Sequence, residues 1–582
     1  MDGDAGPGKP KPLFYLAVFI VVAGLIGFAV YRSDIFAPTG TQPGAMPKFS
    51  KEDMEKLKTK VEAADANAPT TVKEYKFVPS EKLPPVAGVA GYKKLEDETV
   101  KFALNVWAGW APIVFANEGF KPKKEWTAPD GKKFKVELVL IDNPVSMRDA
   151  YAAGQVHIGW ATLDMLPLFM DDLQKDSRTM PRVFQQIDWS NGGDGIVARE
   201  NIKTISDLRG KTVVLAENSP SQYFVLNALI NGGVQPAEVK FLYTSDAFQA
   251  AAAFAADRDK KISAAVSWAP DIYKLAKIPG NRMLVTTGEA NHLIADVWFA
   301  RADFAKDYPG IIEALVRGIL DADEDLESQE NKQKAAKWMA EGYNIPPDDA
   351  LGMLGDAHWT NYAENREFFL NANNPTNFER TWDNSYFLYR SIRKVGEKVS
   401  FEKVMDFSIV QKLGEEEKYK KSANKYLVQF VPKSVGAIKA EATEILTKTV
   451  VIHFFPNDWN IHYKVTKDVG GKTVEELYDP RADFVIEEIG KMAGQFGAAR
   501  IVIEGHTDAS MKGQVPASLV KELSQNRANA VKQALLQKFT NIPMNQIATE
   551  GLGWERPADP ANLLDHARNR RVEVKVYPLE AQ

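Results

Sequence analysis

The chain contains no cysteine, and this absence excludes disulfide bonds, Cys-ligated zinc, iron–sulfur clusters and thiol catalysis. It also lacks an excess of charge of either sign, because 72 Lys and Arg residues stand against 77 Asp and Glu residues. The formal net charge of -5 supplies no positive field that would hold nucleic acid, so no nucleic-acid partner is predicted.

Motifs of common catalytic sites are missing as well. The sequence has no G-x-S-x-G elbow, Walker loop or G-x-G-x-x-G, and no two of its seven histidines have the i, i+3 or i+4 spacing of a helical metal site. We therefore predict no catalytic residue, no metal site and no cofactor. The composition is that of a globular protein, and 582 residues predict three or four folded units.

Residues 13–31 form the one long apolar run, nineteen residues without a charge. At about 1.5 Å per residue this run matches the hydrocarbon core of a bilayer, so it is interpreted as an uncleaved transmembrane helix. Lys9 and Lys11 precede it, which favours a cytoplasmic N-terminus over residues 1–12. The remainder of the chain would then lie outside the cytoplasm.

Residues 32–98 are interpreted as a linker, because they are rich in Pro, Gly, Ala, Thr and Lys without sustained periodicity. From residue 99 to 425 short apolar runs alternate with helical patterns, which predicts an α/β fold of two lobes with mostly parallel sheets. The clearest unit has a strand at 212–216, Ser219 as helix cap and Pro220 at the first helical position. Such a helix start favours an anion.

The same region resembles the periplasmic solute-binding proteins of the nitrate, taurine and thiamine-precursor group, which have a two-lobed type II fold. The matching segments are WAGWAP at 107–112, AAGQVHIGW at 152–160, DGIVA at 194–198, ISDLRGKTV at 205–213 and SWAPD at 267–271. The resemblance implies that a ligand binds in a cleft between the lobes. The helix start at Ser219 and Pro220 favours a small anionic or zwitterionic solute there. By position, the residues lining it would be Trp110, Trp160, Asp194, Ser219, Ser221, Trp268 and Asp271. For each tryptophan, packing within a lobe is the alternative.

A linker at 426–448 leads to a C-terminal domain at 449–582. Strand patterns occur at 449–455, 500–504, 547–551 and 571–577, and helical patterns occur at 482–496 and 518–539. In the second helix Leu519, Leu523, Val531 and Leu535 form a ridge at i+4 spacing that also holds Arg527. An arginine on an apolar ridge needs an anion, and Asp508 is the candidate neighbour.

This segment resembles the OmpA-like peptidoglycan-binding domain, a βαβαββ fold, in the motifs IEGHTD at 503–508, LSQNRANAV at 523–531, EGLGWERP at 550–557 and NRRVEV at 569–574. The resemblance implies that Asp508 and Arg527 grip the diaminopimelate of the stem peptide, with Asn569 and Arg570 as further contacts. A zwitterionic amino acid end presents an ammonium to a carboxylate and a carboxylate to a guanidinium. An internal Asp508–Arg527 ion pair is the alternative.

Three functions follow from this order of parts. The first is a non-enzymatic, single-pass inner-membrane protein whose bulk lies in the periplasm, where it binds a solute and grips peptidoglycan. A membrane permease or a motor is left open as its partner. The second is a cell-wall anchor of the flagellar MotB type, although the run at 13–31 lacks the carboxylate that an ion-carrying span needs. The third is an enzyme related to pyrimidine-precursor synthases.

The apolar run generates a direct prediction about the mature N-terminus. N-terminal sequencing of the membrane fraction should begin at or near Met1, because 13–31 is long enough to span a bilayer and no small-x-small cleavage site follows it. A mature form that starts beyond Arg32 would show that the run is a cleaved signal.

Overall fold

The computed structural model describes residues 61–63, 70–469 and 472–579. Among these residues no helix is both long enough and apolar enough to cross a membrane. The predicted span at 13–31 lies outside the described residues.

The first lobe is built on a mixed seven-stranded sheet in the order β14-β7-β13-β6-β3-β5-β4. Its strands are β3 (Thr99–Leu104), β4 (Trp126–Thr127), β5 (Lys133–Leu140), β6 (Ile158–Thr162), β7 (Pro181–Ser190), β13 (Ala295–Arg301) and β14 (Ala357–Trp359). Strands β3, β5 and β6 run parallel, whereas β13 runs antiparallel to both β6 and β7. Helices α3 (Ala111–Ala116), α4 (Pro144–Ala152) and α5 (Leu166–Leu173) follow its parallel strands.

The second lobe has a seven-stranded sheet in the order β1-β2-β10-β9-β11-β8-β12. Its strands are β1 (Val61–Ala63), β2 (Glu74–Val78), β8 (Asp194–Arg199), β9 (Thr212–Ala216), β10 (Lys240–Thr244), β11 (Ala264–Trp268) and β12 (Asn281–Thr286). Helices α6 (Pro220–Asn231), α7 (Ala247–Ala256) and α8 (Asp271–Ala276) connect them. The predicted strand at 212–216 and the predicted helix start at Ser219 and Pro220 agree with β9 and α6. Within the range predicted as a linker, 32–98, β2 pairs with β10.

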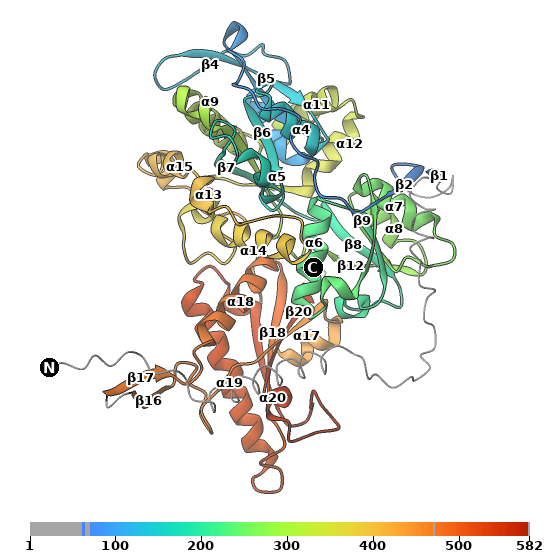
Figure 1. The fold of residues 1–582 in the computed structure, drawn as a ribbon, viewed down its shortest axis with the longest axis vertical. Coiled ribbons are helices and arrows are strands. Elements are labelled where there is room, and N and C mark those ends of the chain that lie inside the picture. Colours follow the sequence, from blue (N-terminus) through green and yellow to red (C-terminus); the bar gives the residue numbers. More distant parts are fainter. Residues whose placement is uncertain (1–60, 64–69, 470–471, 580–582) are drawn as a thin grey trace, which may run out of the picture. The chain divides into compact units, whose positions relative to one another are not determined.

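Three chain crossings join the lobes, from β2 to β3, from β7 to β8 and from β12 to β13. After β13 the chain continues as α9 (Ala302–Asp307), α10 (Pro309–Asp325), α11 (Gln329–Tyr343), α12 (Pro347–Gly352), α13 (Tyr362–Leu370), α14 (Phe378–Ser391), α15 (Ser408–Leu413) and α16 (Glu417–Lys420). Helix α14 packs against α5 of the first lobe and α6 of the second. The colours of Figure 1 follow the chain through this two-lobed body.

The C-terminal domain has a four-stranded sheet in the order β15-β20-β18-β19. Its elements are α17 (Val435–Glu441), β15 (Leu446–Val450), β16 (Lys464–Val469), β17 (Lys472–Leu477), α18 (Ala482–Gln495), β18 (Ala499–His506), α19 (Ala517–Lys538), β19 (Ile547–Gly553), α20 (His566–Asn569) and β20 (Val572–Pro578). The main strands and helices give the predicted βαβαββ order, with the β16–β17 hairpin added before α18 (Figure 1). The range 426–448, predicted as a linker, holds α17 and the start of β15.

Helix α19 buries a different ridge from the predicted one. Leu519 is 55% exposed, whereas the buried positions are Val520, Ser524, Ala528, Val531 and Leu535. The first part of the buried face is therefore displaced by one residue, because Gly505 and Gly551 approach the backbone of α19 at Ser524 and Gln525 and leave no room for larger side chains there. Arg527 consequently lies beside the core-facing stripe and is half-buried.

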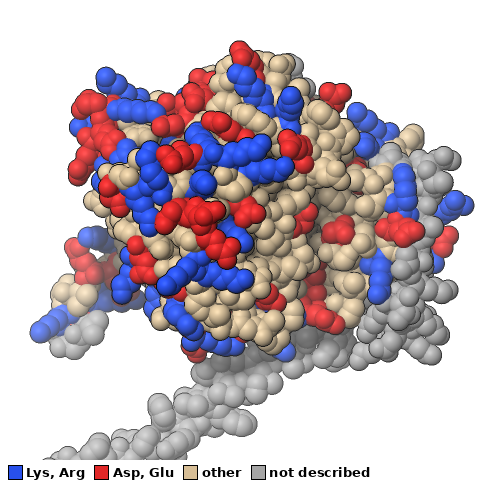
Figure 2. All heavy atoms as spheres, turned by 90° about the horizontal axis from the view of Figure 1, so that it is seen from above, with Lys and Arg blue, Asp and Glu red and all other residues tan. Residues whose placement is uncertain are grey.

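Positive and negative side chains alternate over the face shown in Figure 2, without a broad area of one sign. This distribution agrees with the nearly balanced composition. It gives no electrostatic footprint of the kind that nucleic-acid-binding surfaces show.

Candidate functional site

The surface between the lobes is rich in buried carboxyl groups. On the first lobe Asp188 of β7 and Asp296 of β13 lie directly opposite each other in the sheet, and Asp296 also lies opposite Thr162 of β6. Like charges at opposed positions destabilise a sheet. Burial raises the pKa of Asp188 to about 7. Burial and the neighbouring Asp188 charge raise the pKa of Asp296 well above its ordinary value.

Asp164 lies in the turn between β6 and α5. Its side chain is fully buried, and neither carboxylate oxygen has a hydrogen-bond partner. Burial raises the pKa of Asp164 to about 8. Its charge helps to raise the pKa of Tyr223 on α6 and of Tyr389 on α14, both of which burial raises first. Asp164 of the first lobe therefore interacts electrostatically with Tyr223 of the second lobe and with Tyr389 of α14.

Asp194 begins β8 at the crossing between the lobes. Its carboxylate accepts a hydrogen bond of 2.8 Å from the Ser190 hydroxyl, and Ser190 also contacts the Thr287 hydroxyl at 2.9 Å. Trp268 of β11 lies directly opposite Asp194. Burial raises the pKa of Asp194 to about 7. The structure thus brings together two residues, Asp194 and Trp268, that the sequence predicts for the solute site.

Trp107 of the first lobe contacts the chain segment between β7 and β8. Its indole N–H donates to Asp188 at 3.1 Å. A Cβ atom at Gly193 would approach the Trp107 ring to 2.6 Å, so only glycine permits this contact. The indole ring and the carboxyl groups therefore share one small region.

The other predicted solute residues have partners within the protein or lie in a core. Trp110 is fully buried and donates to Asn105 at 2.7 Å, and Trp160 donates to the Ile141 carbonyl at 3.1 Å. The Ser219 hydroxyl donates to the Ala216 carbonyl at 2.8 Å. Ser221 is fully buried, and its hydroxyl has no partner.

Asp271, also predicted for the solute site, accepts hydrogen bonds from the backbone N–H of Thr71 at 2.8 and 2.9 Å and from its hydroxyl at 2.6 Å. This carboxylate therefore fixes the segment before β2 to α8. Such a contact between residues 200 positions apart leaves no trace in the local sequence pattern.

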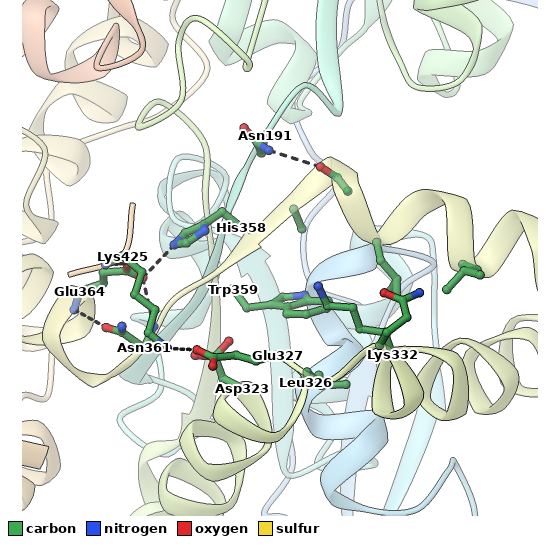
Figure 3. A pocket seen from close by; sticks show the side chains of 15 residues that line it. Asn191, Asp323, Leu326, Glu327, Lys332, His358, Trp359, Asn361, Glu364 and Lys425 are labelled. Atoms are coloured by element: carbon green, nitrogen blue, oxygen red, sulfur yellow. Dashed lines mark hydrogen bonds and ion pairs between the residues drawn. The ribbon is translucent and has the colours of Figure 1, made fainter. Parts of the chain in front are cut away.

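A separate hollow of about 490 Å³ opens on the first lobe beside β14 (Figure 3). Most charges around it are already paired: His358 contacts Glu364 at 2.9 Å, and Lys425 pairs with Glu327. Burial raises the pKa of Asp323 to about 7, and the Glu364 charge adds to this. The hollow contains none of the residues that the sequence predicts for the solute site.

In the C-terminal domain Asp508 is held by two basic side chains. Its carboxylate contacts the Arg570 guanidinium and the His566 imidazole, the latter at 2.5 Å, and accepts the Ser510 backbone N–H at 2.8 Å. Although burial opposes it, the hydrogen bonds from Ser510 and the contacts with His566 and Arg570 lower the pKa of Asp508 to about 2. The group is therefore ionised throughout the physiological range.

Arg527 faces the same cluster without a carboxylate partner among the described residues. Its Nε donates to the Asp458 carbonyl at 3.0 Å, and the guanidinium lies 5.0 Å from the Phe454 ring. Burial lowers the pKa of Arg527 to about 10, and the nearby Arg570 charge contributes. The internal Asp508–Arg527 ion pair is not formed, because Arg570 and His566 occupy Asp508 instead.

Asn569 is buried and shapes the loop before β20. Its amide donates to the Asn562 carbonyl at 2.9 Å, and its side-chain oxygen accepts the Asp559 N–H at 3.1 Å. Asn569 thereby positions its neighbour Arg570. His566, which sequence reasoning did not select, joins the site through the one-turn helix α20.

Glu504, His506 and Glu573 bring three potential metal-ligand atoms within 4.8 Å of one another. The sequence prediction of no metal site considered helical spacing only and missed this arrangement across two strands. However, the Lys439 ammonium contacts Glu504, and Lys575 lies 3.5 Å from Glu504 and 3.6 Å from Glu573. These ammonium groups occupy the place of a cation, so the cluster is an ionic network of the sheet.

Comparison with known proteins assigns families to both parts of the chain. The family described as NMT1/THI5 like matches residues 132–329, and the OmpA family matches residues 475–571. The taurine-binding periplasmic protein of Escherichia coli (strain K12) is 26% identical over 281 residues, which cover 46% of this chain and 80% of that protein.

The chain combines an NMT1/THI5-like solute-binding domain with a C-terminal OmpA domain.

Solved structures similar to this chain include the periplasmic aliphatic sulphonate binding protein SsuA from Escherichia coli, at 17% identity and a TM-score of 0.41 over 58% of this chain and 98% of that one. The periplasmic nitrate-binding protein NrtA from Synechocystis PCC 6803 gives 16% identity and a TM-score of 0.39 over 55% and 89%. The relative and the two structures named here are described as binding proteins for taurine, aliphatic sulphonate and nitrate, respectively.

Sequence reasoning missed Asp164, Asp188, Asp296 and Trp107 in the solute-binding domain. The sequence contained a signal for two of them. Asp164 follows one apolar run and Asp188 lies near the end of another, and the carboxyl ends of these runs meet at the same sheet edge. Asp296 lies at the start of an antiparallel strand. Its position at this edge depends on the sheet order, which the sequence pattern does not contain.

The buried carboxyl groups make the stability of the folded protein depend on pH. Asp164, Asp188 and Asp194 have folded pKa values of about 8, 7 and 7, above the ordinary value of 3.8. The stabilisation is therefore fully present below pH 4 and is lost as pH rises to about 8, at up to about 1.4 kcal/mol per pH unit for each carboxyl. The other titratable groups facing the cluster are Asp296, Asp356, Tyr223, Tyr389 and Tyr426.

Denaturant unfolding between pH 6 and pH 9 should accordingly give a free energy of unfolding that falls with pH, and Asp164→Asn should flatten this slope. Histidines that are neutral when folded do not produce a fall in this range. An exposed carboxyl, Asp259, pairs with Lys261, and Asp259→Asn should leave the slope unchanged. Equal slopes in all three proteins would contradict the assignment.

Proposed function

We propose that this protein is an envelope component that binds a small solute between its two lobes and attaches to peptidoglycan through its OmpA domain. The observation that carries the attachment is that the Asp508 carboxylate and the Arg527 guanidinium lie in one cluster with Arg570, and Arg527 has no carboxylate partner among the described residues. The carboxylate is ionised, and the half-buried guanidinium of Arg527 keeps its charge at neutral pH.

The chemistry of a diaminopimelate stem peptide fits this arrangement. Its zwitterionic end offers a carboxylate, which the Arg527 guanidinium can bind with two parallel N–H donors. Its ammonium would approach Asp508, where the exposed side chains of Arg570 and His566 can move aside. Asn569 holds the loop that carries Arg570, so it acts by positioning.

Solute binding is supported by the polar groups at the carboxyl edges of the strands in both lobes, where open α/β folds bind ligands. Asp194 and Trp268 are the predicted residues that lie together there. Ser221, with its unpartnered hydroxyl, is a further candidate contact. In this proposal Trp110, Trp160, Ser219 and Asp271 support the walls of the site, because each has a partner inside the protein.

An inner-membrane anchor at 13–31 completes the proposal, with the solute-binding and OmpA domains in the periplasm and a membrane permease or motor as candidate partner. The anchor is supported by the length and apolarity of the run alone. A protein attached to both layers would hold its solute-binding domain at a fixed place in the envelope.

A sacculus pull-down tests the attachment. Wild-type protein should sediment with diaminopimelate-type peptidoglycan, and Asp508→Ala or Arg527→Ala should weaken binding. Removing one partner of a buried charged contact typically costs about 2 to 5 kcal/mol, which corresponds to a roughly 30-fold or greater loss of affinity.

Arg568→Ala is the matched control, because Arg568 lies near the same loop but its exposed guanidinium pairs with Asp559. This variant should bind like wild type, with the fold of every variant checked by circular dichroism. Undiminished binding by both folded test variants would contradict the proposed role of Asp508 and Arg527 in binding peptidoglycan.

A further inference from the structure

The interlobe carboxyl groups lack a counter-charge. Among the described residues, no lysine or arginine forms an ion pair with Asp164, Asp188, Asp194 or Asp296, and all four are at most 5% exposed. Elsewhere in the same domain buried acids are neutralised, as Glu217 is by Lys394 at 2.7 Å. Buried carboxyls without a counter-charge are costly to ionise, so four of them in one region require an explanation.

Several oxygen atoms in this region are also unused. Both oxygens of Asp164 and one oxygen each of Asp188 and Asp194 are buried without a hydrogen-bond partner, and so is the hydroxyl of Tyr389. Tyr389 is fully buried, and its pKa responds to Asp164. Buried polar atoms are nearly always hydrogen-bonded. Four carboxyl oxygens and one hydroxyl without partners therefore indicate a ligand that offers several donors to the carboxyls.

The spacing of these carboxyl groups distinguishes between kinds of cation. A single metal ion needs several ligand atoms drawn close around it, and the described residues achieve this only at Glu504, His506 and Glu573. The interlobe acids lie instead on β7, β8 and β13 and in the turn after β6. A wider arrangement fits a larger cation with several N–H donors.

Aromatic rings lie among the same acids. Trp107 contacts Asp188, and Trp268 lies opposite Asp194; both indoles are partly exposed. Indole faces attract organic ammonium groups, and the combination of aromatic faces with carboxylates is how proteins recognise such cations. An anion at this place would face four acidic groups and no described basic one.

We infer that the surface between the lobes selects an organic cation, a small solute whose buried end carries an ammonium or similar nitrogen group. This inference rests on the proposed solute-binding function and names the chemical class of the solute. It replaces the anionic solute expected from the helix start at Ser219, because that hydroxyl is bound to Ala216 and carboxyl groups dominate the surroundings.

The same groups couple binding to closure of the lobes. Closure places carboxyls of the first lobe beside Asp194 and α6 of the second, which is costly unless a cation lies between them. Without solute the lobes are expected to separate and return these groups to water, by the hinge motion usual for two-lobed proteins. Because the bound cation holds the carboxyls ionised, binding near pH 7 should release protons.

The test uses the full chain and two sets of probes. Agmatine, putrescine and tryptamine carry cationic nitrogen with N–H donors and no acidic group, whereas ethanesulfonate and nitrate are anions without an ammonium. Calcium chloride represents a metal cation. Binding is measured by thermal shift and by titration calorimetry in two buffers of different ionisation enthalpy, which reports proton release. At least one organic cation should raise the unfolding temperature and release protons.

Asp164→Asn and Asp194→Asn provide the variants. Each should reduce the affinity for the organic cation at least tenfold. Without solute at pH 8, the unfolding temperature of each variant should equal or exceed that of the wild type, because a repulsive charge is removed. A merely structural carboxylate would instead lower the unfolding temperature on substitution. Asp259→Asn, at an exposed pair with Lys261, should change neither property.

Binding of ethanesulfonate or nitrate with no response to the organic cations would overturn the cation inference and leave the proposed solute-binding function intact. A response to calcium alone would likewise overturn it in favour of a metal ion. If none of the six probes binds, both the inference and the proposed solute-binding function fail.

Discussion

The burial of uncompensated carboxyl groups between two lobes is the constraint on which the solute-binding domain depends. A β-sheet edge normally separates like charges, yet Asp188 and Asp296 lie opposite each other, with Asp164 and Asp194 close enough to affect their ionisation. In the absence of a cation the protein can reduce this cost only by keeping protons on the carboxyls or by exposing them to water. The raised pKa values of the carboxyls, the proposed hinge motion and the proposed preference for a cation therefore follow from one arrangement.

The OmpA domain has the opposite arrangement of charges. Here the buried acid, Asp508, has an excess of basic neighbours, and the arginine beside it, Arg527, has only backbone carbonyls and an aromatic ring. The site thus presents one occupied carboxylate and one guanidinium without a carboxylate. A ligand with both charges can satisfy the two groups together, which a purely anionic or cationic ligand cannot do.

Local patterns were sufficient for much of the fold. The strand at 212–216, the helix start at Ser219 and Pro220 and the C-terminal order of strands and helices were predicted from apolar periodicity and turn residues, and the structure places them within a few residues. The ridge of α19 was displaced because close backbone approach at Gly505 and Gly551, far away in sequence, selects which helix face is buried. Periodicity specifies that a face exists; its neighbours determine its position.

The sequence by itself determined the two families, the absence of thiol chemistry and the identity of Asp508, Arg527, Asp194 and Trp268 as candidate residues, because motifs and composition are local properties. Only the tertiary structure decided that Asp164, Asp188 and Asp296 share one buried surface, and that Arg570 rather than Arg527 pairs with Asp508. The physical reason is that ionisation and pairing depend on desolvation and on distances between groups. Strand order and loop packing set both quantities, and neither is encoded in the spacing along the chain.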